Sequence, residues 1–263
     1  MRVLVTNDDG VHSPGLLALA RALRTAAETF VVAPEHERSA ASHAITLHKP
    51  LRAVPISLGD TGLPAWATNG TPADCVVLGV LDLLGTRPDV VVSGINLGAN
   101  LGMDLIYSGT VSGAVEAALF GIASIAISVT AFQDVHWQPA ASFATRLTQE
   151  VYRHGLPRDT FLNVNVPNLP GDEIRGVEIT RQSSRRYVNR LEKRSDPRGR
   201  TYYWLTGSTH ADERTDPGTD AWAAMEGRIS LTPLRLDMTY EELRPLFRSW
   251  NLNGSWNLNP LPQ

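Results

Sequence analysis

Two adjacent carboxylates follow the first apolar run of the sequence. Asp8 and Asp9 come directly after residues 3–5, in the segment Asn7-Asp8-Asp9-Gly10. Like charges this close repel each other unless a cation lies beside them. Their oxygens are hard donors, which suit Mg²⁺, Mn²⁺ or Ca²⁺. We therefore favour a divalent-metal site at Asp8 and Asp9, and the alternative is that both residues only form a turn with Gly10.

An anion-binding turn is predicted further along the chain. Ser108-Gly109-Thr110 opens a segment with helical spacing of apolar residues, and free N–H groups and hydroxyls at a helix N-terminus bind anions. The alternative is that these residues only cap the helix. The preceding loop, residues 93–104, holds three glycines together with Asn96 and Asn100. Such a loop lets the backbone approach a ligand closely, or it is simply a tortuous surface loop.

A cation held by oxygen atoms beside an anion-binding turn is suited to metal-assisted hydrolysis of phosphate esters. Other phosphate and nucleotide motifs are missing from the sequence: there is no Gly-x-x-x-x-Gly-Lys-Ser/Thr and no Gly-x-Gly-x-x-Gly after the first strand. A P-loop enzyme and a dinucleotide dehydrogenase are therefore disfavoured. Zinc is disfavoured too, because His36 and Glu37 lack a second histidine at position 40, where the chain has Ala40.

Alternating strand and helix patterns must position these residues. Apolar runs of strand length alternate with helical patterns, which predicts a parallel sheet covered by helices on both faces. The predicted strands are residues 3–5, 30–32, 90–92, 125–128 and 161–166. The predicted helices begin at Pro14, after Thr71 and after Ser108, and a fourth covers about 139–154. Apolar residues expected to face the core include positions 16, 19, 20, 23, 76, 77, 80, 81, 84, 111, 115, 118 and 119.

The last third of the chain has a different pattern. Residues 187–206 predict a long hairpin with its turn at 196–199. Aromatic residues at 202–204 suggest that a partner subunit covers this arm, and the alternative is that the arm packs on its own domain. A short helix at 219–226, a strand at 229–232 and a final helix at 239–247 are also predicted. Thr239 and Glu242 would form a capping box for the last helix.

Composition limits the classes of function. The chain has 263 residues and a formal net charge of −3, so no overall positive field favours a nucleic-acid polymer. The basic run at 181–200 is interpreted as a solvated surface. Cys75 is the only cysteine, which suits a reducing compartment. Without an evident leader or an apolar stretch of spanning length, we expect a cytoplasmic protein with no membrane partner.

Several motifs in one order resemble the SurE family. They are Thr-Asn-Asp-Asp-Gly at 6–10, Val-Ala-Pro at 32–34 with Ser39 downstream, Asn-Gly-Thr-Pro-Ala-Asp-Cys at 69–75, the loop at 92–104, Tyr-Ser-Gly-Thr-Val at 107–111, Asn-Val-Asn-Val-Pro at 163–167 and Ser-Leu-Thr-Pro-Leu at 230–234. The resemblance implies a Rossmann-like three-layer α/β core with a mostly parallel sheet, a protruding β-hairpin and a C-terminal oligomerisation segment. It implies a core at 1–180 and an oligomerisation region at 181–248, forming a homodimer or homotetramer. The tail at 249–263 is expected to be disordered or loosely docked.

The same resemblance implies a 5′-nucleotidase that acts on nucleoside monophosphates and has some breadth toward 3′-nucleotides and short polyphosphate. It implies one divalent cation per subunit, Mg²⁺ or Mn²⁺. The implied metal ligands are Asp8, Asp9, Ser39 and Asn96, with Asp8 and Asp9 also catalytic, and the implied phosphate contacts are Asn100, Ser108, Gly109 and Thr110. One departure lies beside this site, since Ala40 stands where the family usually has glycine. The alternatives are a phosphatase for another small metabolite and a nucleotide-binding protein without catalysis.

Overall fold

The main sheet of the computed structural model is mostly parallel. The structure describes residues 1–185, 187–209 and 216–250. The strand order is β3-β4-β2-β1-β5-β6-β7-β11-β8, and only the β3–β4 and β7–β11 pairs are antiparallel. The strands are β1 Arg2–Thr6, β2 Glu28–Pro34, β3 Ala53–Ile56, β4 Ala65–Thr68, β5 Val90–Leu97, β6 Ala123–Val129, β7 Thr160–Val166, β8 Val177–Ile179 and β11 Ile229–Arg235. The predicted α/β class is confirmed.

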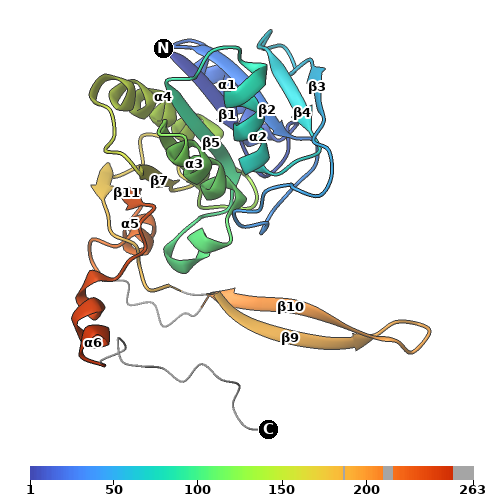
Figure 1. Ribbon diagram of the computed structural model, residues 1–263, viewed down its shortest axis with the longest axis vertical. Helices are drawn as coiled ribbons and strands as arrows, with labels where there is room; N and C mark the ends of the chain where they lie inside the picture. The colour runs from blue at the N-terminus through green and yellow to red at the C-terminus, as the bar shows by residue number, and fades with distance from the viewer. Residues whose placement is uncertain (186, 210–215, 251–263) are drawn as a thin grey trace.

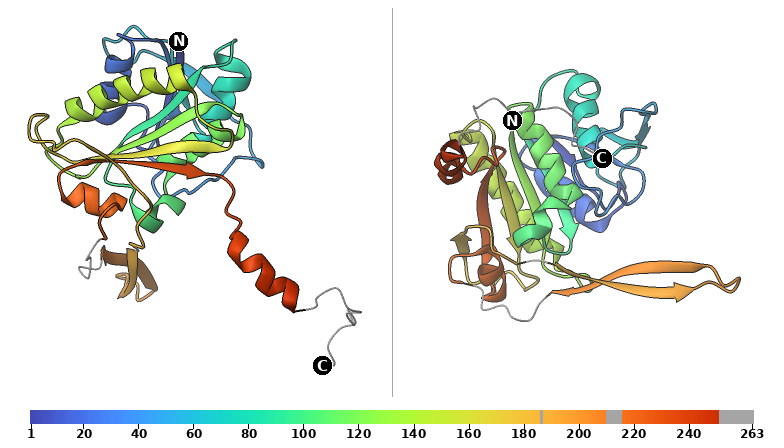
Figure 2. Two further views of the ribbon diagram at one scale, coloured as in Figure 1. Left: turned by 90° about the vertical axis from the view of Figure 1, so that its left-hand side faces the viewer. Right: turned by 60° about the horizontal axis from the view of Figure 1, so that its bottom comes forward.

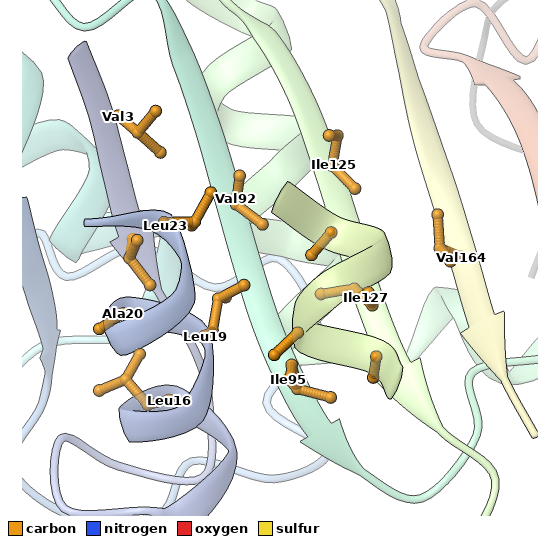
Figure 3. Packing of buried hydrophobic residues seen from close by; sticks show 14 of the residues in the cluster. Val3, Leu16, Leu19, Ala20, Leu23, Val92, Ile95, Ile125, Ile127 and Val164 are labelled. Atoms are coloured by element: carbon orange, nitrogen blue, oxygen red, sulfur yellow. The ribbon is translucent and has the colours of Figure 1, made fainter. Parts of the chain in front are cut away.

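Helices cover both faces of this sheet (Figure 1). One face packs against α1 (Pro14–Leu23) and α4 (Trp137–His154), and the other against α2 (Pro72–Leu78) and α3 (Gly109–Leu119). Side chains alternate along β1: Val3 and Val5 join the first core and Leu4 the second. Figure 3 shows Leu19 and Leu23 of α1 near Val92 and Ile95 of β5 in the first core. The three layers follow from this alternation.

The predicted helix starts are confirmed by their caps. Ser13 accepts the N–H of Leu16 at the start of α1, and Thr71 forms a capping box with Asp74 at the start of α2.

Two residues predicted to face the core do not: Leu81 is 68% exposed and Leu119 is 59% exposed. After α2 the chain winds as a π-helix (Gly79–Leu83), and the wider turn changes which side chains face inward. Leu119 is the last residue of α3, where the helix leaves the sheet.

The predicted hairpin forms a separate two-stranded sheet that extends away from the core (Figures 1 and 2). It consists of β9 (Tyr187–Ser195) and β10 (Thr201–Thr209), and Asp196 accepts the N–H groups of Arg198 and Arg200 in the turn. Tyr203 and Trp204 are more than half exposed. Most of the surface of these two side chains is therefore left uncovered by their own chain.

The C-terminal segment differs in part from its prediction. The short helix α5 (Asp220–Met225) and strand β11 form as expected. The final helix is a 3₁₀ turn, η3 (Glu241–Leu243), followed by α6 (Arg244–Ser249). The capping box is wrong: the N–H of Thr239 donates to Asp237, and α6 starts after Leu243 with proline in its first turn, a position that proline favours.

The division at residue 180 stays a prediction, and β11 from the second segment completes the main sheet between β7 and β8. Of the predicted tail, residues 251–263 lie outside the described residues. Three short strands, β3, β4 and β8, were not predicted, because each has only three or four residues and a mixed burial pattern. Within the described ranges, no helix is both long and apolar enough to cross a membrane.

Candidate metal and phosphate site

The two carboxylates lie where the strand order reverses. From β1 the chain proceeds to β2 on one side, and it later returns to β5 on the other side of β1. Asp8 and Asp9 follow β1, and Asn96 lies at the end of β5. In open α/β sheets, ligands bind in the crevice outside the carboxyl ends of the strands at such a reversal. The topology therefore brings the predicted metal residues to a binding crevice.

Asp8 is buried against the start of α3. Its Oδ1 accepts the Thr110 hydroxyl at 2.5 Å and its Oδ2 accepts the Thr110 N–H at 3.0 Å. Burial raises the pKa of Asp8, and the hydrogen bonds from Thr110 oppose that effect. Two glycines one helical turn apart allow this close packing: a Cβ at Gly109 would lie 2.8 Å from Asp8 atoms, and one at Gly113 would lie 2.8 Å from Ser93 Oγ.

Gly109→Ala is expected to damage the site more than the fold. The new methyl group would displace the Asp8 carboxylate, and a shift of about 1 Å in a reacting group can cost roughly 100-fold in rate. Overpacking should also lower the free energy of unfolding by about 1–3 kcal/mol. Gly171→Ala is the control, since its Cβ would meet only Pro139 at 3.8 Å. Steady-state kinetics and urea denaturation of both variants test the prediction, and equal activities would contradict it.

Asp9 and Asn96 present oxygens to the same crevice. Asp9 Oδ2 accepts the N–H of Leu97 at 3.1 Å. The Asn96 amide donates to Gly98 O at 2.7 Å, and its Oδ1 lies 3.4 Å from the Thr110 hydroxyl. Burial, and then the neighbouring Asp8 carboxylate, raise the pKa of Asp9 to about 7. Both carboxylates are therefore held where their negative charge is unfavourable without a cation.

This donor set fits a hard divalent cation. Asp8 and Asp9 form no ion pair with Lys, Arg or His in the part of the chain that the structure describes. Among all the residues that the structure describes, there is no cluster of three or more His, Cys, Asp or Glu side chains that could hold a metal ion. Two carboxylates and an amide oxygen are typical of Mg²⁺ or Mn²⁺ with bound water, rather than of zinc.

Ser39 lies in an exposed loop that is tied to the site at other points. The N–H of Arg38 donates to Asp8 O at 2.7 Å, and the N–H of Ser42 donates to Tyr107 O at 3.1 Å. The Ser39 hydroxyl donates to Glu37 at 2.6 Å. It is not hydrogen-bonded to Asp8, Asp9 or Asn96. The structure thus fastens the loop beside Asp8 and leaves the predicted role of Ser39 a prediction.

Ala40 adopts a left-handed backbone conformation, with φ of 55°. This conformation costs a residue with a Cβ about 1–2 kcal/mol, and glycine avoids the cost. Ala40→Gly is therefore expected to raise the free energy of unfolding by up to about 1 kcal/mol. Ala41→Gly is the matched control, because Ala41 is not among the residues with positive φ, and it should lower stability. Thermal denaturation of both variants separates the two signs, and a loss of stability in both would contradict the prediction.

Ser108 and Thr110 of the predicted phosphate turn already make hydrogen bonds within the protein. The Ser108 hydroxyl accepts the N–H of Val111 at 3.1 Å and so caps α3. Thr110 donates both of its groups to Asp8. A helix N-terminus that would stabilise a phosphate here also stabilises a carboxylate. Asp8 is thereby fixed at the positive end of α3.

Asn100 is held by a buried polar network that the sequence analysis missed. Asn165 accepts the backbone N–H of Asn100 at 2.8 Å and donates to its carbonyl at 2.9 Å. Asn163 donates to the same carbonyl, and the Asn100 amide donates to Ser128 Oγ at 2.8 Å. The signal was present: two asparagines at i and i+2 place polar side chains on one face of a buried strand, where they need partners.

A second anchor of this loop was also missed. Asp220 is fully buried at the start of α5 and accepts the N–H groups of Gly102 and Ser183, both at 2.9 Å. It therefore joins the loop after β5 to the segment that leads into the hairpin. Nothing in the local sequence around Asp220 distinguishes it from an ordinary helix-start aspartate.

Comparisons with known proteins agree with this architecture. The sequence profile of the family described as survival protein SurE matches residues 3–189. A 5′-nucleotidase SurE from Geobacter sulfurreducens is 52% identical over 97% of this chain and 95% of its own length. One from Heliobacterium modesticaldum is 49% identical over 97% and 93%. The crystal structure of the SurE protein from Aquifex aeolicus superposes with a TM-score of 0.82, with 41% identity over 95% of this chain and 99% of that one. The chain belongs to the SurE family.

Proposed function

We propose that this chain is a divalent-metal-dependent phosphatase that hydrolyses nucleoside 5′-monophosphates to nucleoside and phosphate. The observation that carries the proposal is the pair formed by the buried Asp8 and the half-buried Asp9, beside Asn96 and the start of α3. The chain is also about half identical, over nearly its full length, to proteins named 5′-nucleotidase SurE. Asp8, Asp9, Asn96 and Ser39 are the proposed metal ligands, with Mg²⁺ or Mn²⁺ as the cation.

The hydrogen bonds suggest different roles for the two carboxylates. Both oxygens of Asp8 accept from Thr110, whereas the hydrogen bond to Asp9 engages only Oδ2. Asp9 is therefore better placed to take the proton of an attacking water, and Asp8 to hold the cation. A bound Mg²⁺ or Mn²⁺ would polarise a phosphate oxygen and lower the pKa of a bound water. Ser108, Gly109, Thr110 and Asn100 are proposed to lie around the phosphate.

Attack by Asp8 itself, through an aspartyl-phosphate, is disfavoured for the same reason, because Thr110 restrains both of its oxygens. The stereochemistry at phosphorus separates the two routes, measured with AMP whose phosphate is made chiral by sulfur and oxygen isotopes. A single in-line attack by water inverts the configuration at phosphorus. Retention would show two successive displacements through an aspartyl-phosphate and make the carboxylate the nucleophile.

Phosphate release tests the proposed function. AMP is expected to be hydrolysed in the presence of Mn²⁺ or Mg²⁺, and excess chelator should abolish the reaction. A panel with other 5′-nucleotides, 3′-AMP, tripolyphosphate and glucose 6-phosphate defines the substrate class. Preference for glucose 6-phosphate would favour a phosphatase of another metabolite. Binding of AMP by calorimetry without release of phosphate would favour a non-catalytic nucleotide-binding protein.

We also propose that a second copy of the chain covers the hairpin, giving a homodimer or homotetramer. Leu191, Tyr203, Trp204 and Leu205 of the arm are each more than half exposed, and a two-stranded arm is marginally stable alone in water. Trp204→Glu is expected to lower the sedimentation mass, whereas Arg198→Glu in the turn should not change it. An unchanged mass for Trp204→Glu would contradict the interface.

We also propose a cytoplasmic location, because the single cysteine, Cys75, is buried and free, which suits a reducing compartment.

A further inference from the structure

One exposed aromatic side chain lies at the same edge of the sheet as the candidate site. Phe132 is in the loop after β6 and is 76% exposed. A single exposed apolar residue is common on protein surfaces and means little by itself. The position is what distinguishes Phe132, because β6 pairs with β5, the strand that ends in Asn96 and Leu97.

The ring of Phe132 is seated on the backbone of Gly98. A Cβ built on Gly98 would lie 2.5 Å and 2.8 Å from two carbons of the Phe132 ring. The ring can therefore contact the backbone at position 98 only because glycine has no side chain. Gly98 is itself fixed: its N–H donates to Val129 O at 3.1 Å, and its carbonyl accepts from the Asn96 amide at 2.7 Å. The ring is therefore held by the same turn that orients a proposed metal ligand.

We propose that Phe132 is the platform on which the base of the nucleoside monophosphate stacks. The inference rests on the proposed function and adds a base-recognising element to it. Stacking on an aromatic face needs no particular hydrogen-bond pattern, because every base has such a face. The platform therefore recognises nucleotides as a class and does not select one base.

The distance between the Phe132 ring and the proposed metal ligands suits the binding of a base. Leu97 links the two places, since its N–H donates to Asp9 at 3.1 Å and the next residue, Gly98, carries the ring. Adjacent Cα atoms are about 3.8 Å apart, so the path from the Asp9 carboxylate to the ring is on the order of 10 Å. A ribose can bridge this gap. The ring is already seated before substrate binds, which reduces the entropy cost of ordering it.

Replacing Phe132 should affect substrates that carry a base and spare those that do not. Phe132→Ala is expected to raise KM for AMP roughly 5- to 150-fold, the range found for stacking of a base on an aromatic side chain. KM and kcat for ribose 5-phosphate, which has no base, should be unchanged. Phe132→Trp keeps an aromatic face and should restore the KM for AMP, whereas Phe132→Leu should not.

Two further variants complete the test. Tyr152→Ala removes a 52% exposed aromatic from α4 and should leave both substrates unaffected. Tyr107→Ala probes the exposed aromatic that precedes Ser108, and a selective loss for AMP there but not at Phe132 would overturn the platform. An equal loss of kcat/KM for AMP and ribose 5-phosphate in Phe132→Ala would also overturn it. If the wild-type enzyme released phosphate from neither substrate, the proposed function itself would fail, and the platform with it.

Discussion

Asp8→Asn and Asp9→Asn are each expected to lower kcat/KM for AMP by at least about 1000-fold. A bound cation contributes several kcal/mol of charge stabilisation in the transition state, and each 1.36 kcal/mol is a factor of ten in rate. An amide in place of either carboxylate removes a negative charge from the site, and so weakens cation binding. Asparagine keeps the size and one oxygen acceptor of aspartate, so Thr110 retains a partner at position 8.

The fold of these variants is expected to survive. The pKa of each carboxyl is raised in the folded protein, so its charge is unfavourable there without a cation. A neutral amide should then leave the metal-free unfolding free energy unchanged or higher, while the stabilisation on adding Mn²⁺ is lost. Asp82→Asn, on the exposed side of the π-helix after α2, is the control and should keep full activity. Near-normal turnover of both site variants at limiting metal would rule out this metal site.

The core of the fold could be predicted because its signals are local. Val3, Leu4 and Val5 form a continuous apolar run, which is typical of a strand buried on both faces. Thr71 indicates the start of a helix, because its side chain caps α2. The short strands β3, β4 and β8 have no such signal. They form because each can pair with a neighbouring strand of the sheet. The local sequence does not show which strand will be the neighbour.

The site was only partly predictable for a related reason. The position of Asp8 and Asp9 follows from their place after the first strand, because ligands gather at that edge of the sheet. Their contact with Thr110 depends on how closely α3 approaches β1, and Gly109 and Gly113 set that distance across about 100 residues of chain. The turn at Ser108 was predicted to face a ligand, yet two of its donors serve Asp8. Long-range packing decides such pairings, and one sequence does not show it.

The metal-free protein is expected to lose stability at the site as pH rises. The pKa of Asp9 is about 7 in the folded chain against an ordinary value of 3.8 for an aspartate, so the folded state holds this proton more tightly than the unfolded state. The stabilisation from Asp9 is fully present below about pH 4 and is lost as pH rises through about 7. The limit is about 4 kcal/mol for a shift of about 3 pKa units, and residual solvent exposure reduces it. Asp8 acts in the same direction.

A bound cation should reverse this dependence, because it binds the ionised carboxylates and binds more tightly as they lose their protons. The difference in unfolding free energy between the Mn²⁺-loaded and chelated protein should therefore widen from pH 5 to pH 8 in urea denaturation. Exposed carboxyls such as Asp60 and Asp196 have lowered pKa values and contribute a background of opposite sign. The chelated Asp9→Asn variant has the same pH-dependent contribution from these exposed carboxyls, but it has no carboxyl at position 9 to titrate. Subtracting its pH profile from that of the chelated wild type isolates the site, and identical profiles would mean that Asp9 is not held as an unfavourable charge.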